Sequence, residues 1–117
     1  FYQPTVLLEV AHDTQLTQEE TFGPIAALLR FDTEEEVLTL ANNTAFGLAS
    51  YLYTRDIGRV FRISEALECG MVGVNTGSIS TEVAPFGGIK ASGLGREGSR
   101  YGINDYLEMK YICLSIL

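Results

Sequence analysis

The feature that most constrains the fold is a regular alternation of short apolar runs with signals that begin helices. The runs are rich in strand-forming residues and lie at 5–10, 24–31, 48–54 and 71–75. Such short runs predict strands. The run at 24–31 is apolar almost throughout, which is typical of a strand buried on both faces of a parallel sheet.

Two helices are predicted between these strands. Thr33 and Glu36 form a capping box, in which the Thr33 hydroxyl accepts from the N–H three residues on and Glu36 reaches back. Asp56 is expected to cap a second helix that ends at Gly70. The apolar face of this helix is expected to contain Ile57, Val60, Phe61, Ser64 and Leu67. The order strand, helix, strand, helix, strand predicts an α/β fold with an open, mostly parallel sheet and flanking helices.

The last third of the chain has a different character. Glycines are frequent between residues 77 and 102, and long apolar runs are few. This composition predicts a long structured loop, which in a compact domain usually serves a function. We expect a short helix within 97–105 and, from the alternation of residues 106–114, a closing strand.

Composition and charge exclude several classes of function. The chain has 117 residues, of which 46% are hydrophobic and 20% charged, as in a globular domain. A net charge of −7 argues against binding to nucleic acid or to an anionic membrane, and no apolar run approaches the length of a membrane span. The two cysteines give neither a disulfide framework nor a metal-site spacing, so we expect a reducing compartment, the cytoplasm, and no metal. The start at Phe1, without Met, suggests part of a longer chain.

Several tempting residues are interpreted as structural. The segment 93–98 matches the dinucleotide-binding pattern G-x-G-x-x-G, but loop residues precede it where that site needs a strand. Cys69 lies at the predicted C-terminal end of a helix, where the helix dipole disfavours a thiolate, and Cys113 lies in a predicted strand. His12 is the only histidine and lies on a polar stretch, which is typical of a solvated side chain.

The stretch Glu19-Glu20-Thr21-Phe22-Gly23-Pro24 is a candidate cofactor site. A carboxylate can accept both ribose hydroxyls of a nucleotide, and an adjacent aromatic ring can pack on a flat nicotinamide. The Gly-Pro pair then turns the chain into the following strand. An acidic turn before a strand is the alternative, and this segment alone does not decide between the two.

Two separated motifs resemble those of the aldehyde dehydrogenase superfamily. They are Glu-Thr-Phe-Gly-Pro at 20–24 and Pro-Phe-Gly-Gly-Ile-Lys-Ala-Ser-Gly-Leu-Gly-Arg-Glu at 85–97, in the expected order and spacing. The similarity runs across nearly the whole chain, and residues 78–86 and 96–99 look most like NAD(P)-dependent succinate-semialdehyde dehydrogenases. The tail at 113–117 departs from that pattern, where those enzymes more often show a Gly-Gly pair.

The resemblance implies the C-terminal portion of an oxidoreductase that oxidises succinate semialdehyde to succinate. In such enzymes a cysteine thiolate adds to the aldehyde, hydride passes to NAD or NADP, and the thioester is hydrolysed by water that a glutamate activates. By position, Glu20 would hold the nicotinamide ribose and Phe22 would bound the ring. Phe86 would line the aldehyde tunnel, and Ser80 would donate to the distal carboxylate of the substrate. Glu97 would release protons or brace the glycine loop.

The resemblance also implies a domain organisation for the chain. Residues 1–105 would belong to the catalytic domain, and 106–117 would form the closing strand of an oligomerisation sheet shared with a neighbouring subunit of a homo-oligomer, a dimer or tetramer. The nucleophilic cysteine and the nucleotide-binding turn would precede Phe1, so residues 1–117 alone are expected to be inactive. The alternatives are an enzyme for another semialdehyde or general aldehyde, and a noncatalytic association module.

Overall fold

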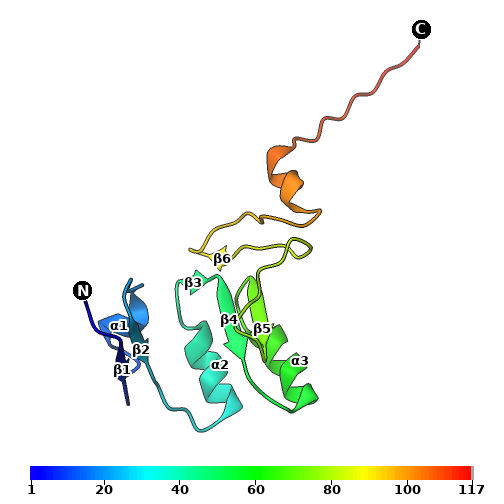
Figure 1. The fold of residues 1–117 in the computed structure, drawn as a ribbon. Helices are drawn as coiled ribbons and strands as arrows, with labels where there is room; N and C mark the ends of the chain where they lie inside the picture. The colour runs from blue at the N-terminus through cyan, green and yellow to red at the C-terminus, as the bar shows by residue number, and fades with distance from the viewer. Residues whose placement is uncertain (117) are drawn as a thin grey trace.

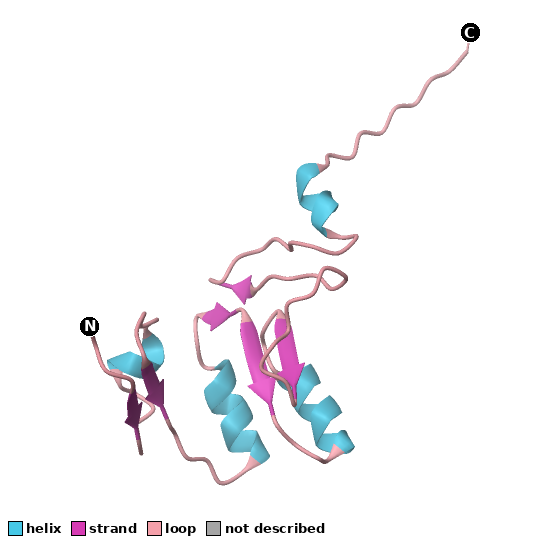
Figure 2. Ribbon diagram, in the orientation of Figure 1, coloured by secondary structure: helices cyan, strands magenta, loops and turns pink. Residues whose placement is uncertain are grey.

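The computed structural model describes residues 1–116, which form an elongated α/β arrangement (Figure 1). Its helices and strands, separated by colour in Figure 2, follow one another in this order: β1 (Thr5–Leu7), α1 (Gln15–Gln18), β2 (Ile25–Ala27), α2 (Glu34–Asn42), β3 (Phe46–Gly47), β4 (Ala49–Leu52), α3 (Ile57–Ala66), β5 (Met71–Val74), β6 (Ile89–Lys90) and the 3-10 helix η1 (Gly102–Tyr106). None of the described helices has the length and apolar character that crossing a bilayer requires.

The described strands pair in three small sheets of two strands each. β1 pairs with β2 in parallel, and β4 pairs with β5 in parallel with Leu52 opposite Val74. The third pair, β3 with β6, is antiparallel and places Gly47 opposite Ile89. The predicted α/β class with mostly parallel pairing is confirmed. The predicted strand at 48–54 is the shorter β4, and two strands that were not predicted, β3 and β6, lie before it and within the expected loop.

The capping residues begin both main helices as predicted. The Thr33 hydroxyl accepts from the Glu36 N–H at 3.1 Å, and the Glu36 carboxylate accepts from the backbone N–H of Asp32, at 2.7 Å, one residue before the cap. Asp56 Oδ1 accepts from the N–H groups of Gly58, at 2.8 Å, and Arg59, at 3.2 Å. This helix, α3, ends at Ala66 with Leu67 as its C-cap, so the predicted end at Gly70 is wrong by one turn.

The buried face of α3 differs from the predicted one. Ile63 is the buried residue, with 6% of its surface exposed, and it was not on the predicted face. Val60, Ser64 and Leu67 are half-buried beside it, as expected. Ile57 and Phe61 are 70% and 62% exposed, because the face directed at α2 and β4 runs through Ile63.

Most apolar side chains of the described residues are uncovered. Ile63 is the one buried hydrophobic residue among residues 1–116. The accessible surface is 9782 Å² for 12.8 kDa, whereas a compact monomer of this mass exposes about 6300 Å². The radius of gyration is 19.3 Å, against about 13 Å for a compact chain of this length. The elements therefore have the local form of a folded domain but do not enclose a core.

The C-terminal segment extends away from the rest of the molecule (Figure 1). The short helix expected within 97–105 is the 3-10 helix η1, which begins at Gly102. Residues 107–116 follow as exposed chain in neither helix nor strand, so the predicted closing strand is not formed within the described residues. A strand requires a partner, and residues 1–116 supply none for this segment.

Candidate functional site

The segment that carries Ser80 follows the carboxyl end of β5. Ser80 is exposed, whereas its neighbour Ile79 is half-buried. In open parallel sheets, ligands bind beyond the carboxyl ends of the strands. The place of Ser80 therefore fits the predicted contact with a substrate, and its exposed hydroxyl can donate a hydrogen bond to a carboxylate.

Phe86 and Glu97 are brought together by a short antiparallel bridge. The N–H of Phe86 donates to the carbonyl of Glu97 at 2.9 Å, and the N–H of Glu97 donates to the carbonyl of Phe86 at 2.7 Å. Phe86 is half-buried and Glu97 is exposed. The backbone of Glu97 thus braces the segment that carries Phe86, which fits the bracing role expected for it.

The glycine segment after Phe86 is held by Arg96. One guanidinium nitrogen, Nη1, donates to the carbonyls of Gly88 at 2.6 Å and of Gly95 at 2.9 Å. The backbone N–H of Arg96 donates to the carboxylate of Asp105, in η1, at 2.8 Å. Because a side chain on Gly87 would clash with the carbonyl oxygen of Gly95, the turns of this segment pack backbone against backbone.

A hollow of about 760 Å³ lies against this segment. It is formed by Phe86, the glycine-rich turns after it and the helix η1. Neither Glu20 nor Phe22 lines it, so the structure places the candidate cofactor residues apart from this hollow. The segment 93–98 contains no helix, and the next helix begins only at Gly102. These features agree with rejection of a dinucleotide-binding turn here.

Glu20 and Phe22 lie on the exposed connection between α1 and β2. Phe22 is 94% exposed, like many apolar side chains of the described residues, so its ring is free for a flat partner. The Glu20 side chain makes no hydrogen bond within the described residues, so both oxygens are available to ribose hydroxyls. The carbonyl of Pro24 then accepts from the N–H of Thr5 at 2.9 Å and fixes the end of this connection. The assignment of these residues to the nicotinamide end of a dinucleotide stays a prediction.

The residues interpreted as structural have ordinary surroundings. Cys69 is half-buried, and its thiol donates to the carbonyl of Met71 at 3.1 Å. Cys113 is exposed on the extended tail, so its predicted place in a strand is not formed within residues 1–116. His12 is exposed, and its carbonyl accepts from the side chain of Thr17 at 2.8 Å. Within the described residues there is no group of three or more metal-ligating side chains.

Two polar residues with structural contacts near the site, Lys90 and Asn75, were not predicted from the sequence. Lys90 contacts the ends of both main helices, and Asn75 closes the end of the β4–β5 pair. Both have positive φ, 54° for Lys90 and 55° for Asn75. An Asn directly after a strand was the available signal for Asn75, since Asn tolerates this backbone region. The sequence offers no comparable signal for Lys90.

The chain belongs to the aldehyde dehydrogenase family, whose model matches residues 1–112. It is 65% identical over 116 residues to the glutarate-semialdehyde dehydrogenase of Pseudomonas putida. It is 68% identical over 114 residues to a 3-sulfolactaldehyde dehydrogenase of Pseudomonas putida, and 63% identical over 116 residues to the NADP(+) succinate-semialdehyde dehydrogenase of Escherichia coli. These alignments cover 97–99% of this chain.

The solved structures agree with this family assignment. The crystal structure of a succinate-semialdehyde dehydrogenase from Burkholderia pseudomallei superposes with a TM-score of 0.94 at 65% identity, covering 99% of this chain and 24% of that chain. An NADP-dependent enzyme from Escherichia coli gives a TM-score of 0.95 at 63% identity, with the same coverage. The chain therefore spans about a quarter of the length of the curated relatives it matches. The predicted resemblance to a portion of an aldehyde dehydrogenase is confirmed.

Proposed function

We propose that this chain is the C-terminal quarter of an NAD(P)-dependent dehydrogenase for aldehydes with a distal acidic group, and that succinate semialdehyde is its substrate. One observation carries this proposal. Three relatives that are 63–68% identical are named for glutarate semialdehyde, 3-sulfolactaldehyde and succinate semialdehyde. Each of these aldehydes carries a carboxylate or sulfonate away from its reacting carbon.

The residues of this chain would bind and orient rather than form the covalent intermediate. Ser80 would donate to the distal carboxylate, and Phe86 would form a wall beside the aldehyde. Glu20 would hold the nicotinamide ribose while Phe22 bounds the ring. The dinucleotide, when bound, supplies the hydride acceptor. A cysteine outside residues 1–117 would form the thioester, since the Cys69 thiol is half-buried against a carbonyl and Cys113 lies on the exposed tail.

Glu97 would support the glycine segment or take part in proton release. Its backbone pairing with Phe86 supports a bracing role, and its exposed carboxylate leaves proton release open. The exposed segment after η1 supports a second proposal, that residues 106–117 complete a sheet with a neighbouring subunit of a cytoplasmic homo-oligomer. A row of unpaired backbone groups is a ready template for strand addition.

The test is Ser80→Ala in the complete enzyme that contains these residues. Loss of one hydrogen bond to a charged group should raise KM for succinate semialdehyde about tenfold, with little change in kcat. Ser78→Ala is the matched control, because Ser78 is an exposed serine on the same loop whose hydroxyl makes no hydrogen bond within the described residues. Equal KM values for the native enzyme and Ser80→Ala would reject the carboxylate contact and favour a general aldehyde.

Oligomer size and dinucleotide binding together distinguish the enzyme from the noncatalytic association module. An association module would form oligomers in size-exclusion chromatography through its exposed tail without any contribution to nucleotide binding. The complete enzyme should instead lose affinity for its dinucleotide when Glu20 is replaced. Oligomers of the complete protein that neither bind a dinucleotide nor oxidise an aldehyde would favour the association module.

A further inference from the structure

At the end of the β4–β5 pair, the side chain of Asn75 continues the hydrogen bonding between the two strands. The two strands are parallel and in register up to Leu52 opposite Val74, and the N–H of Asn75 donates to the Leu52 carbonyl at 2.8 Å. The side chain of Asn75 then accepts from the N–H of Thr54 through Oδ1 at 2.9 Å. It also donates to the carbonyl of Thr54 through Nδ2 at 2.9 Å. Both backbone groups of Thr54 are therefore satisfied by one amide.

This arrangement needs an amide at this position and directs the chain out of the sheet. Among side chains of this length, asparagine alone presents an acceptor and a donor on one short planar group. Its backbone φ of 55° lies in the left-handed region, which Asn adopts more readily than most residues. The chain therefore leaves the sheet sharply at Asn75 and enters the loop that carries Ser80.

The loop beyond Asn75 is held at two further points. Ile79 packs on Gly73 in the middle of β5, where an added Cβ would lie 2.8 Å from Ile79 Cγ2. On the other side of Ser80, the carbonyl of Glu82 accepts from the N–H of Ser99 at 3.0 Å, which joins this loop to the glycine-rich segment. Ser80 is thus an exposed hydroxyl on a loop that is fixed both before and after it.

We propose that Asn75 is a positioning residue for substrate selection: by bonding both backbone groups of Thr54, it sets the path of the loop that presents Ser80 to the distal anion. This inference rests on the proposed function, because it assigns Ser80 to the anion. Asn75 itself does not touch the substrate. It acts through the direction in which the chain leaves β5.

The experiment compares two aldehydes with the complete enzyme and its Asn75→Gly variant. Glycine tolerates the same φ and adds no charge, so the substitution removes the two side-chain bonds without forcing a different backbone conformation. We expect KM for succinate semialdehyde to rise about tenfold and kcat to change less than about twofold, as for loss of a hydrogen bond to a charged group. KM for the uncharged aldehyde butanal should stay within about twofold, because butanal has no anion for Ser80 to bind.

Asn43→Gly is the matched control. Asn43 is exposed at the C-cap of α2 with φ of −78°, and its side chain makes no hydrogen bond within the described residues. This variant should leave both KM values unchanged. If Asn75→Gly does not yield folded enzyme, Asn75→Ser gives the same comparison, because one hydroxyl cannot replace both bonds to Thr54.

The outcomes separate this inference from the proposed function. Equal loss of kcat/KM for both aldehydes would overturn the positioning role and leave Asn75 a general structural residue. So would unchanged kinetics in the Asn75 variants, while Ser80→Ala still raises KM for succinate semialdehyde. A native enzyme with no preference for succinate semialdehyde over butanal would instead remove the proposed function, and this inference with it.

Discussion

The ammonium group of Lys90 lies 2.6 Å from a carboxylate oxygen of Glu68, and this ion pair ties β6 to the chain just after α3. The same ammonium donates to the carbonyl of Asn42 at 2.9 Å, in the last turn of α2, where a cation also meets the negative end of the helix dipole. Asn42 in turn bonds the N–H of Glu68 at 2.9 Å and the carbonyl of Ala66 at 2.8 Å. The ends of both helices are therefore joined to the strand that leads into Ser92.

Replacement of Lys90 by methionine should destabilise this junction. The variant keeps the apolar stem but loses the ammonium, so the Glu68 carboxylate loses its ion pair and the Asn42 carbonyl keeps only the N–H of Thr44 as a donor among the described residues. We expect the free energy of unfolding of the complete enzyme to fall by about 1–2 kcal/mol, because the lysine side chain is only 25% exposed. Urea denaturation measures this change. Arg55→Met, at an exposed cation with no ion pair within the described residues, should have no comparable effect, and equal effects of the two would contradict the proposed importance of the junction.

Alanine at Gly70 should displace the glycine segment. A Cβ there would clash with the carbonyl oxygen of Gly87 and lie 2.9 Å from Gly88 Cα, so backbone atoms must move. We expect a loss of about 1–3 kcal/mol in unfolding free energy, as for other overpacked sites. Turnover should also fall, because a shift of the Gly87 backbone would move the neighbouring Phe86. Gly23→Ala is the matched control for stability, since nothing lies within 4 Å of the position of its added methyl. A Gly70→Ala enzyme as stable as the Gly23→Ala enzyme would show that this close approach is unimportant.

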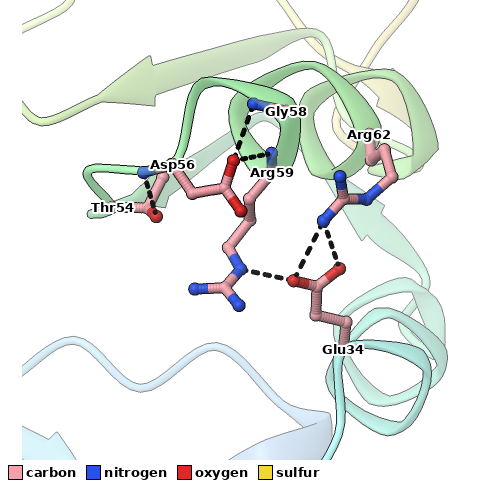
Figure 3. Close-up of polar contacts among 6 residues, drawn as sticks. All are labelled: Glu34, Thr54, Asp56, Gly58, Arg59 and Arg62. Carbon is pink, nitrogen blue, oxygen red and sulfur yellow. Dashed lines mark hydrogen bonds and ion pairs between the residues drawn. The ribbon is translucent and has the colours of Figure 1, made fainter.

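The contact between α2 and α3 should depend on pH. Hydrogen bonds from Arg59 and then Arg62 hold the pKa of the Glu34 carboxyl below its ordinary value of 4.5 (Figure 3). A carboxyl with a lowered pKa in the folded state stabilises the fold above pH 4.5, and this contribution is lost as the pH falls through the folded pKa. Glu34→Gln should therefore lower the unfolding temperature at pH 7, with a deficit that shrinks as the pH falls below 4.5 and disappears below the folded pKa. The loss of stability should be smaller than that of Lys90→Met, because the two arginines are about half exposed to water, which weakens an ion pair.

Glu35→Gln is the control for this titration. Glu35 occupies the same first turn of α2, so both substitutions remove one acid from the N-terminal end of the helix dipole. Glu35 has no ion pair within the described residues. A deficit of the same size and pH profile in both variants would assign the effect to the helix dipole and not to the two arginines.

The sequence predicted those parts of the fold that depend on neighbouring residues. The caps at Thr33 and Asp56 are made by contacts two or three residues apart, so the starts of α2 and α3 were predicted correctly. The buried face of α3 was predicted with an error. Ile63 lies at helical spacing from Val60 and Leu67, just as Phe61 does from Ile57, and only the position of β4 decides which stripe is covered.

Features that depend on residues far apart in the chain could not be predicted from the sequence in the same way. The expected closing strand has no partner within residues 1–116, because pairing is a property of two segments and not of one. The glycine segment was correctly predicted to be mostly loop, but β6, the bridge between Phe86 and Glu97 and the contacts of Lys90 join residues without any periodic pattern. The roles of Glu20, Phe22, Ser80, Phe86 and Glu97 stay predictions.

Residues 1–117 alone should show neither turnover nor a cooperative fold. Among the described residues only Ile63 buries an apolar side chain, so little hydrophobic free energy offsets the entropy of ordering the chain. We expect no sharp thermal transition by circular dichroism, strong binding of a hydrophobic dye, and no NAD(P)-dependent oxidation of succinate semialdehyde. A sharp transition would show that the segment folds independently. Measured turnover by the pure segment would overturn the assignment of the nucleophile to a residue outside it.

Substitution of Glu20 by glutamine tests the cofactor assignment directly. A carboxylate can accept from two ribose hydroxyls, whereas an amide oxygen accepts without charge and its nitrogen only donates. KM for the dinucleotide should therefore rise about tenfold in the complete enzyme, while KM for the aldehyde changes little. Glu19→Gln is a control in the adjacent residue, whose carboxylate already accepts from the Gln15 side chain at 2.9 Å. An unchanged KM for the dinucleotide in Glu20→Gln, or an equal rise in Glu19→Gln, would mean that the connection before β2 is an acidic turn without a role in cofactor binding.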